Sequence, residues 1–292
     1  MIIKKKDIDQ ISQLLNLNKI KNCKLISSSF DINCIKIQLE NDEKYIVKYY
    51  IKENQKFNAI ESELKNLIFL QNNNLNFFPK IKVKNNKYLI IEFVENNNCK
   101  PQTTNNDLLK SIIKIHSISN RQYGFEFSTQ IGGLEKINFF ENNWVNFYRD
   151  KRLLPIFDLI NKKNVIDLKM SNRIENLIKK IDSIIPDNPK PSLLHGDLWE
   201  GNILFHNEKF ISFIDPGSFF GHNEMEVAYL RWFNPVFVDS EFLKKYNNFI
   251  NINNDYLDYE PVYQLYYSLL NVYLWDNSYI SDSKNLLKKL KM

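Results

Sequence analysis

Apolar residues follow two kinds of spacing in the first third of the chain. They recur every three or four residues over 7–17 and 57–71, which predicts an amphipathic helix in each segment. Shorter β-like runs fall in two pairs, each pair joined by a polar turn, which predicts two β-hairpins. The four strands are expected at 34–39, 45–50, 80–83 and 88–94.

Helical spacing dominates the rest of the chain, apart from a short strand–turn–strand at 203–205 and 210–214. The order of elements predicts an α+β chain with a small antiparallel β-sheet lobe over 1–94 and a larger, mainly helical lobe over 95–292. The helices of the second lobe are expected at 107–118, 139–160, 171–184, 224–234, 240–250 and 259–275.

Glycine is scarce and unevenly placed. The 292 residues contain only seven glycines, and four of them lie between residues 196 and 221. Because glycine adopts positive φ and lets other groups approach the backbone closely, this clustering indicates functional turns in that segment.

The formal net charge of +5 does not by itself indicate a partner. Only five of the 39 basic residues are arginine, and no nucleic-acid motif is present, so no nucleic-acid partner is expected. The longest apolar runs are too short to span a bilayer, so no membrane partner is expected. Three scattered cysteines are typical of a reducing compartment, and we expect a cytoplasmic protein. Nothing in the pattern indicates an oligomeric state.

Two segments carry residues suited to phosphoryl transfer, LLHGDLWEGN at 193–202 and ISFIDPG at 211–217. Phosphoryl transfer needs a carboxylate that orients the attacking hydroxyl and accepts its proton, together with oxygen ligands for Mg²⁺. Asp197 fits the first role, and Asn202 and Asp215 fit the second. The short hairpin between Asn202 and Asp215 has the length needed to bring the two side chains to one place.

HGDLWEGN at 195–202 and IDPGSFFGHNEMEVA at 214–228 resemble the fructosamine kinase (ketosamine 3-kinase) family. This family belongs to the aminoglycoside phosphotransferase and choline kinase group. The resemblance implies a two-lobed protein kinase-like fold that uses ATP and Mg²⁺. It also implies phosphorylation of a hydroxyl of a ketosamine, either small or attached to a protein lysine, which leads to deglycation.

The resemblance also implies residue roles. Asp197 corresponds to the catalytic carboxylate, and Asn202 and Asp215 correspond to the Mg²⁺ ligands. Lys48 resembles the lysine that pairs with nucleotide phosphates, and Glu63 is its expected helix partner, with Glu61 the weaker candidate. The inter-lobe hinge that reads the adenine edge is expected at Glu92, Phe93 and Val94.

The acceptor side is less strongly marked. Trp199, His222 and Trp144 are candidate substrate contacts, each with a competing structural role in the core or in a supporting position. Two alternatives stay open: a small-molecule kinase for an amino alcohol, aminoglycoside or sugar, and an ATP-binding pseudokinase that binds a partner. The second is motivated by residues 27–33, expected to form the loop over the phosphates, which contain none of the glycine usual there.

Overall fold

The computed structural model describes residues 4–15, 19–52, 55–85 and 87–292. The chain divides into two compact units that are interleaved in sequence. The first contains residues 1–99 together with two later segments, 129–135 and 203–217. The second contains 100–128, 136–202 and 218–292. Most of the first unit is the predicted N-terminal lobe, to which the two later segments are added.

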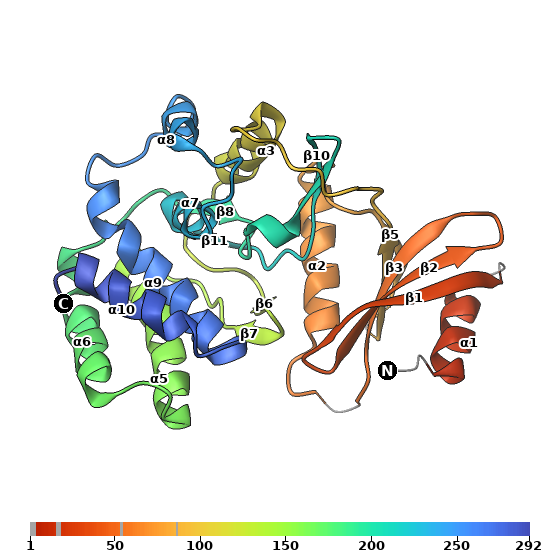
Figure 1. Cartoon of the computed structure of the whole chain (residues 1–292), viewed down its shortest axis with the longest axis horizontal. Helices are drawn as coiled ribbons and strands as arrows, with labels where there is room; N and C mark the ends of the chain where they lie inside the picture. The colour runs from red at the N-terminus through yellow and green to blue at the C-terminus, as the bar shows by residue number, and fades with distance from the viewer. Residues whose placement is uncertain (1–3, 16–18, 53–54, 86) are drawn as a thin grey trace. The chain divides into compact units, whose positions relative to one another are not determined.

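A five-stranded antiparallel sheet forms the centre of the first unit (Figure 1), in the order β1-β2-β3-β5-β4. Both predicted hairpins are present, although Asn86 of the second turn and the end of the predicted 7–17 helix lie outside the described residues. Within this sheet, β1 is the strand that the sequence does not predict, because its residues are mostly polar and exposed. The strands are β1 (Ile20–Ser29), β2 (Ile32–Leu39), β3 (Lys44–Tyr50), β4 (Ile81–Lys84) and β5 (Tyr88–Glu92).

Strand alternation gives the sheet two different faces. On one face Ile35, Val47 and Ile90 are cross-strand neighbours, and they form an apolar core with Ile11 of helix α1 (Lys5–Leu14). One residue along each strand, Cys34, Lys48 and Leu89 are neighbours on the opposite face. Because successive side chains point to opposite sides, the same apolar alternation that builds the core presents Lys48 on the other side.

Helix α2 (Ala59–Asn72) begins at a side-chain cap, in which Asn58 Oδ1 accepts the Glu61 N–H at 3.1 Å. The later segment 203–217 adds a hairpin to this unit, β9 (Ile203–His206) with β10 (Lys209–Phe213). Phe213 donates its backbone N–H to Phe77 O at 3.0 Å and packs edge-on against the Phe77 ring. These contacts fix the residues just before Asp215 within the first unit.

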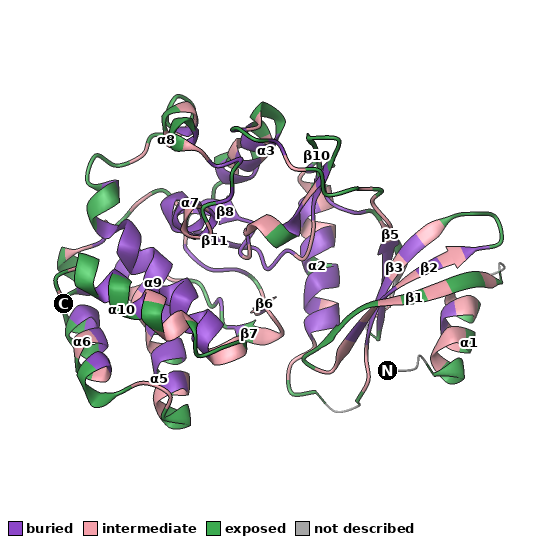
Figure 2. Ribbon diagram, viewed as in Figure 1, coloured by how far each residue is buried: buried purple, intermediate pink, exposed green. Residues whose placement is uncertain are grey.

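The second unit is mainly helical, and helix α9 (Tyr256–Leu274) is buried along most of its length (Figure 2). The predicted 139–160 helix consists of α4 (Trp144–Tyr148), a π-helical turn at Arg149–Leu153 and α5 (Leu154–Lys163). Pro155 lies in the first turn of α5 and lacks the N–H that would continue the regular ladder, which accounts for the wider turn before it. The other helices are α3 (Asn106–Ser117), α6 (Leu168–Lys179), α7 (Asn223–Trp232), α8 (Ser240–Asn247) and α10 (Tyr279–Lys289).

Two short strand pairs complete the fold. Strand β8 (Ser192–Leu194) pairs antiparallel with β11 (Phe219–Gly221), and β6 (Thr129–Ile131) pairs with β7 (Leu134–Lys136). None of these strands was predicted, because each is only three residues long. Within the described residues, no helix is long and apolar enough to cross a membrane.

Candidate active site

Lys48 and Glu63 form a buried ion pair in the first unit. Lys48 Nζ lies 2.7 and 2.9 Å from the two carboxylate oxygens of Glu63, whose side chain is 2% exposed. Glu61, the weaker candidate partner, instead pairs with Lys65 at the surface at 2.8 Å. The structure therefore brings together the two residues that the sequence favoured.

Asp215 completes this cluster through its Oδ1 atom, 2.5 Å from Lys48 Nζ. Burial alone would lower the pKa of Lys48, but the Asp215 and Glu63 carboxylates raise it well above its usual value, so the side chain is a stable ammonium. Burial raises the pKa of Glu63 to about 7, against the opposing effect of the Lys48 charge. The Asp215 side chain is 41% exposed, so it remains accessible to a ligand.

A pocket of about 240 Å³ opens beside this cluster, and all of its lining residues belong to the first unit. Lys48 and Asp215 lie at its polar end, and the predicted hinge residues Glu92, Phe93 and Val94 also line it. Its apolar walls come from Ile26, Ile46, Ile91, Leu204 and Ile214. An apolar slot ending at an ammonium group suits a flat heterocycle joined to an anionic group.

Backbone groups at the end of β5 point alternately to its two edges. Glu92 donates its N–H to Lys80 O at 2.9 Å, and Phe93 donates its N–H to Lys44 O at 3.1 Å, on the β3 side. In extended backbone the N–H and C=O of one residue share an edge, and those of the next residue face the other. The Glu92 N–H therefore faces the edge opposite to β3 and the Phe93 N–H faces β3, and the reading of an adenine edge by Glu92, Phe93 and Val94 stays a prediction.

Residues 27–33 form the tip of the β1–β2 hairpin. Ser27 to Ser29 end β1, and Ile32 begins β2. The two turn residues, Phe30 and Asp31, both have positive φ, at 52° and 59°. The turn therefore adopts without glycine a conformation that glycine adopts most easily. Phe30 packs onto Gly133, where an added Cβ would lie 2.6 Å from the Phe30 Cβ.

The HGD loop follows strand β8 in the second unit, and a single carboxylate holds its first two backbone N–H groups. Glu226 of α7 accepts the N–H of His195 at 2.9 Å and that of Gly196 at 2.6 Å. Burial alone would raise the pKa of Glu226, but its hydrogen bond and charge interaction with His116 lower it, so the carboxylate is ionised. Gly196 has φ of 84°, which explains the glycine at this position.

Asp197 and Asn202 are connected within the same loop. Asn202 Nδ2 donates to Asp197 O at 2.8 Å, which leaves Asn202 Oδ1 as the atom suited to a metal ligand. His195 Nδ1 lies 3.3 Å from the Asp197 N–H, so His195 braces the loop. Asn202 belongs to the second unit and Asp215 to the first, and their joint binding of one Mg²⁺ ion stays a prediction.

One functional candidate was missed by the sequence reasoning. Lys136, at the end of β7, is 4% exposed, and its Nζ donates to Gly196 O at 2.8 Å. No local motif marks this lysine, which lies 60 residues before Gly196. Only the folded chain reveals that it supports the HGD loop.

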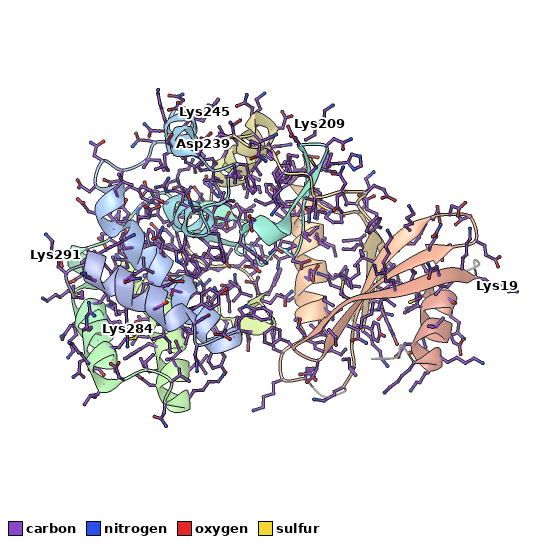
Figure 3. All side chains as sticks on the ribbon, viewed as in Figure 1. Lys19, Lys209, Asp239, Lys245, Lys284 and Lys291 are labelled. Atoms are coloured by element: carbon purple, nitrogen blue, oxygen red, sulfur yellow. The ribbon has the colours of Figure 1, made fainter. Side chains whose placement is uncertain are left out.

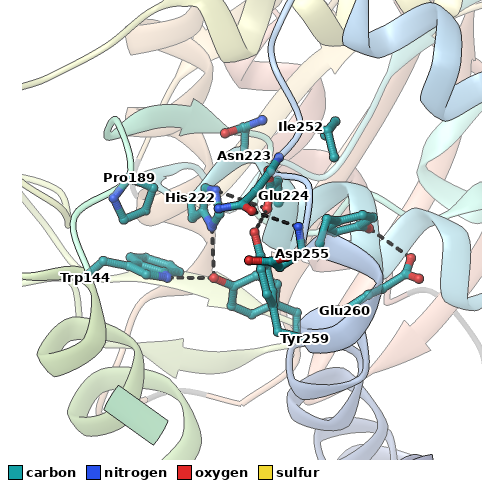
Figure 4. Close-up of polar contacts among 12 residues, drawn as sticks. Trp144, Pro189, His222, Asn223, Glu224, Ile252, Asp255, Tyr259 and Glu260 are labelled. Atoms are coloured by element: carbon teal, nitrogen blue, oxygen red, sulfur yellow. Dashed lines mark hydrogen bonds and ion pairs between the residues drawn. The ribbon is translucent and has the colours of Figure 1, made fainter. Parts of the chain in front are cut away.

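The candidate acceptor residues occupy different surroundings. Trp199 is partly exposed, packs over Gly201 and lies 5.4 Å from the Phe233 ring, centroid to centroid. Trp144 is fully buried, and its indole N–H donates to Tyr263 at 2.8 Å (Figure 4). A substrate contact by Trp144 remains a prediction that its burial does not support.

His222 lies in the same buried network as Trp144, because His222 Nδ1 is 2.9 Å from the Tyr263 hydroxyl (Figure 4). Burial, followed by the His116 charge, lowers the pKa of His222 to about 3, so it is a neutral imidazole. In the β8–β11 pair, Phe219 is opposite Leu194 and Gly221 is opposite Ser192. His222 therefore follows the end of the pair opposite to the HGD loop, and its contact with a sugar also stays a prediction.

The profile of the fructosamine kinase family matches residues 4–292. The chain belongs to this family. A probable ketoamine kinase of Enterococcus faecium is 29% identical over 202 residues, which make up 69% of this chain and 71% of that protein. The ketosamine-3-kinase of Mus musculus is 31% identical over 175 residues, which make up 58% of this chain and 54% of that protein.

A solved structure gives an independent comparison for this fructosamine kinase family member. The crystal structure of a candidate fructosamine-3-kinase from Thermobifida fusca matches with a TM-score of 0.84 and 18% identity, covering 97% of this chain and 98% of that one. At this identity the likeness establishes the fold alone. The predicted α+β, two-lobed kinase-like fold and the family resemblance are therefore confirmed, and the chain is an ATP-dependent phosphotransferase.

Proposed function

We propose that the chain transfers the γ-phosphoryl group of ATP to a hydroxyl of a ketosamine carried on a small amine or on a protein lysine. Phosphorylation of the sugar then destabilises the adduct and leads to deglycation, as the family membership implies. The observation that carries the proposal is the Lys48–Glu63–Asp215 cluster at the end of the first unit's pocket. The HGD loop of the second unit supports it, because Glu226 holds the N–H groups of His195 and Gly196.

The pocket of the first unit would hold the nucleotide. Its apolar walls suit the adenine ring, and backbone groups of Glu92, Phe93 and Val94 would read the adenine edge. Lys48, held in place by Glu63, would bind the phosphates, because an ammonium without a fixed partner loses more rotamer freedom on binding. The hinge would thus contact the adenine and Lys48 the phosphates, with Glu63 holding Lys48 in place.

The donor atoms available for Mg²⁺ fit its preference for oxygen ligands. Asp215 offers a partly exposed carboxylate, and Asn202 offers an amide oxygen whose neighbouring nitrogen is already used by Asp197 O. Mg²⁺ takes its remaining ligands from phosphates and water, so two protein ligands are enough for it. When bound, Mg²⁺ neutralises the phosphate charge.

Asp197 would orient the acceptor hydroxyl and take its proton. The Tyr229 hydroxyl lies 3.4 Å from Asp197 Oδ1, and the backbone on either side of Asp197 is bonded to Asn202 and His195. A carboxylate held in this way needs little rearrangement to reach a productive geometry. Trp199, partly exposed and two residues after Asp197, is the aromatic side chain best placed along the sequence to contact the acceptor.

The test is phosphate transfer from Mg·ATP to a panel of acceptors. Ribulosyl-lysine and fructosyl-lysine should be phosphorylated, and choline, an aminoglycoside and free sugars should not. Asp197→Asn is the matched control, because it preserves the shape of the side chain and removes the base. Transfer to an aminoglycoside or choline alone would assign a different acceptor, and the absence of both transfer and an Mg·ATP-induced thermal shift would indicate a pseudokinase.

A further inference from the structure

Both peptide groups that flank Gly196 are held by buried charged side chains. On the N-terminal side, the Gly196 N–H donates to Glu226 Oε1 at 2.6 Å. On the C-terminal side, the Gly196 carbonyl accepts from Lys136 Nζ at 2.8 Å. Glu226 is 0% exposed and Lys136 is 4% exposed, so water competes little with either bond.

We propose that Lys136 is a positioning residue for phosphoryl transfer, whose Nζ holds the Gly196–Asp197 peptide in its catalytic orientation through the bond to Gly196 O. This inference rests on the proposed function and adds a residue to it. Without Lys136 the Gly196–Asp197 peptide would keep the longer bond of the Asp197 N–H to His195 Nδ1, at 3.3 Å, and would rotate more easily because glycine has no Cβ to restrict its dihedral angles. Such a rotation would move the Asp197 backbone, and with it the carboxylate that orients the acceptor.

Three charged side chains, Arg152, Asp197 and Glu226, influence the pKa of Lys136. Arg152 of the π-helical turn is buried and, like Lys136, lies over the Phe219 ring of β11. The carboxylates of Asp197, in the catalytic loop, and Glu226, on α7, act in the opposite direction. Burial and the Arg152 charge lower the pKa of Lys136 to about 7, so the proton that makes Lys136 a strong donor is lost within the neutral range.

Three variants separate the donor from the charge. Lys136→Met removes both, whereas Lys136→Gln keeps an uncharged N–H donor on a side chain that is one bond shorter. Lys284→Met is the control, since Lys284 is a surface lysine of α10, labelled in Figure 3, that pairs with Asp167. Turnover of Mg·ATP with a ketosamine would be measured from pH 6 to pH 9.

We expect Lys136→Met to lower kcat by about tenfold or more at pH 7 while KM for ATP stays within about twofold, because the nucleotide pocket belongs to the first unit. Lys136→Gln should recover only part of this loss, because an uncharged amide is a weaker donor than an ammonium. The wild type should lose turnover above about pH 7, and this decline should be absent from both Lys136 variants and present in Lys284→Met. A Lys136→Met kcat within twofold of the wild type, or the same alkaline decline in all variants, would overturn the inference.

A stability measurement tests the same lysine without any acceptor. The folded-state pKa of about 7 lies below the unfolded value of about 10.4, so between these pH values the unfolded chain binds the extra proton. The wild-type Tm should therefore rise relative to that of Lys136→Met between pH 7 and pH 10. A constant difference would show that the pKa of Lys136 is not lowered and would refute the predicted loss of turnover above pH 7, even if no acceptor were found. A wild type that shows this rise and yet phosphorylates no ketosamine would contradict the proposed function alone.

Discussion

Two glutamates on helix α2 allow a controlled test of the Lys48 anchor. Glu63→Gln preserves side-chain shape but removes the carboxylate that holds Lys48 Nζ at 2.7 and 2.9 Å. Glu61→Gln makes the same chemical change two residues earlier, where the partner Lys65 is 50% exposed. The two variants share a helix and differ in burial and partner.

The structure indicates that the effect of Glu63→Gln on rate exceeds its effect on stability. One charge-assisted hydrogen bond, worth about 1.5–3 kcal/mol, is lost, and the other becomes a bond to a neutral amide oxygen. The loss is offset because the amide no longer buries a charge and Asp215 still neutralises Lys48. We therefore expect the free energy of unfolding to fall by about 1–2 kcal/mol. In the same variant Asp215 is the one carboxylate of the cluster that still pairs with Lys48, and this pairing competes with metal binding by Asp215. We therefore expect kcat/KM to fall about 100-fold, equivalent to about 2.7 kcal/mol.

The assay combines denaturant unfolding with steady-state kinetics in Mg·ATP at pH 8. Glu61→Gln should change the free energy of unfolding by less than about 0.5 kcal/mol and leave kcat/KM unchanged, as expected for an exposed pair. If Glu63→Gln retained kcat/KM within threefold of Glu61→Gln, the assignment of Lys48 and Glu63 to phosphate binding would be wrong.

Three further predictions concern the second unit. Glu226→Gln should lower the free energy of unfolding by about 2–4 kcal/mol, because the ionised carboxylate accepts both loop N–H groups, and unchanged denaturation would contradict this. Trp144→Phe should lower the free energy of unfolding by about 1 kcal/mol, because the bond to Tyr263 is lost, and should leave KM for the acceptor unchanged. A large rise in this KM would instead support Trp144 as a substrate contact. For His222, the folded-state pKa of about 3 is below the unfolded value of about 6.5, so its contribution to stability is present above pH 6.5 and lost towards pH 3. His222→Asn should therefore reduce the loss of stability at acid pH, measured by unfolding at several pH values. An unaltered pH dependence would argue against a neutral buried imidazole.

Much of the fold could be predicted because the helices and central strands carry regular apolar spacing. Strand β1 could not, since its polar edge residues are held mainly by pairing with β2. The same pairing changes the interpretation of residues 27–33, most of which belong to strands on either side of a two-residue turn. A polar edge strand carries little signal in its own sequence.

The residues expected from the family resemblance are easier to find than the residues that support them. Lys48 and Glu63 are expected as a pair from that resemblance, and the structure brings them together. Lys136 carries no signal in the sequence, because its role depends on the folded position of β7, and Glu226 accepts N–H groups from a loop about 30 residues earlier in the chain. His222 is a candidate substrate contact in the sequence, whereas the unpredicted strand β11 carries the chain to the end of the β8–β11 pair opposite to the HGD loop.

Transfer of labelled γ-phosphate to ribulosyl-lysine and fructosyl-lysine, compared between the wild type and Asp197→Asn, tests the central claim most directly. We predict a phosphorylated sugar with the wild type and a decrease of at least about 1000-fold in kcat for Asp197→Asn, with the Mg·ATP-induced thermal shift retained. Near-normal turnover by Asp197→Asn, or a wild type that binds Mg·ATP and phosphorylates neither compound, would contradict the account.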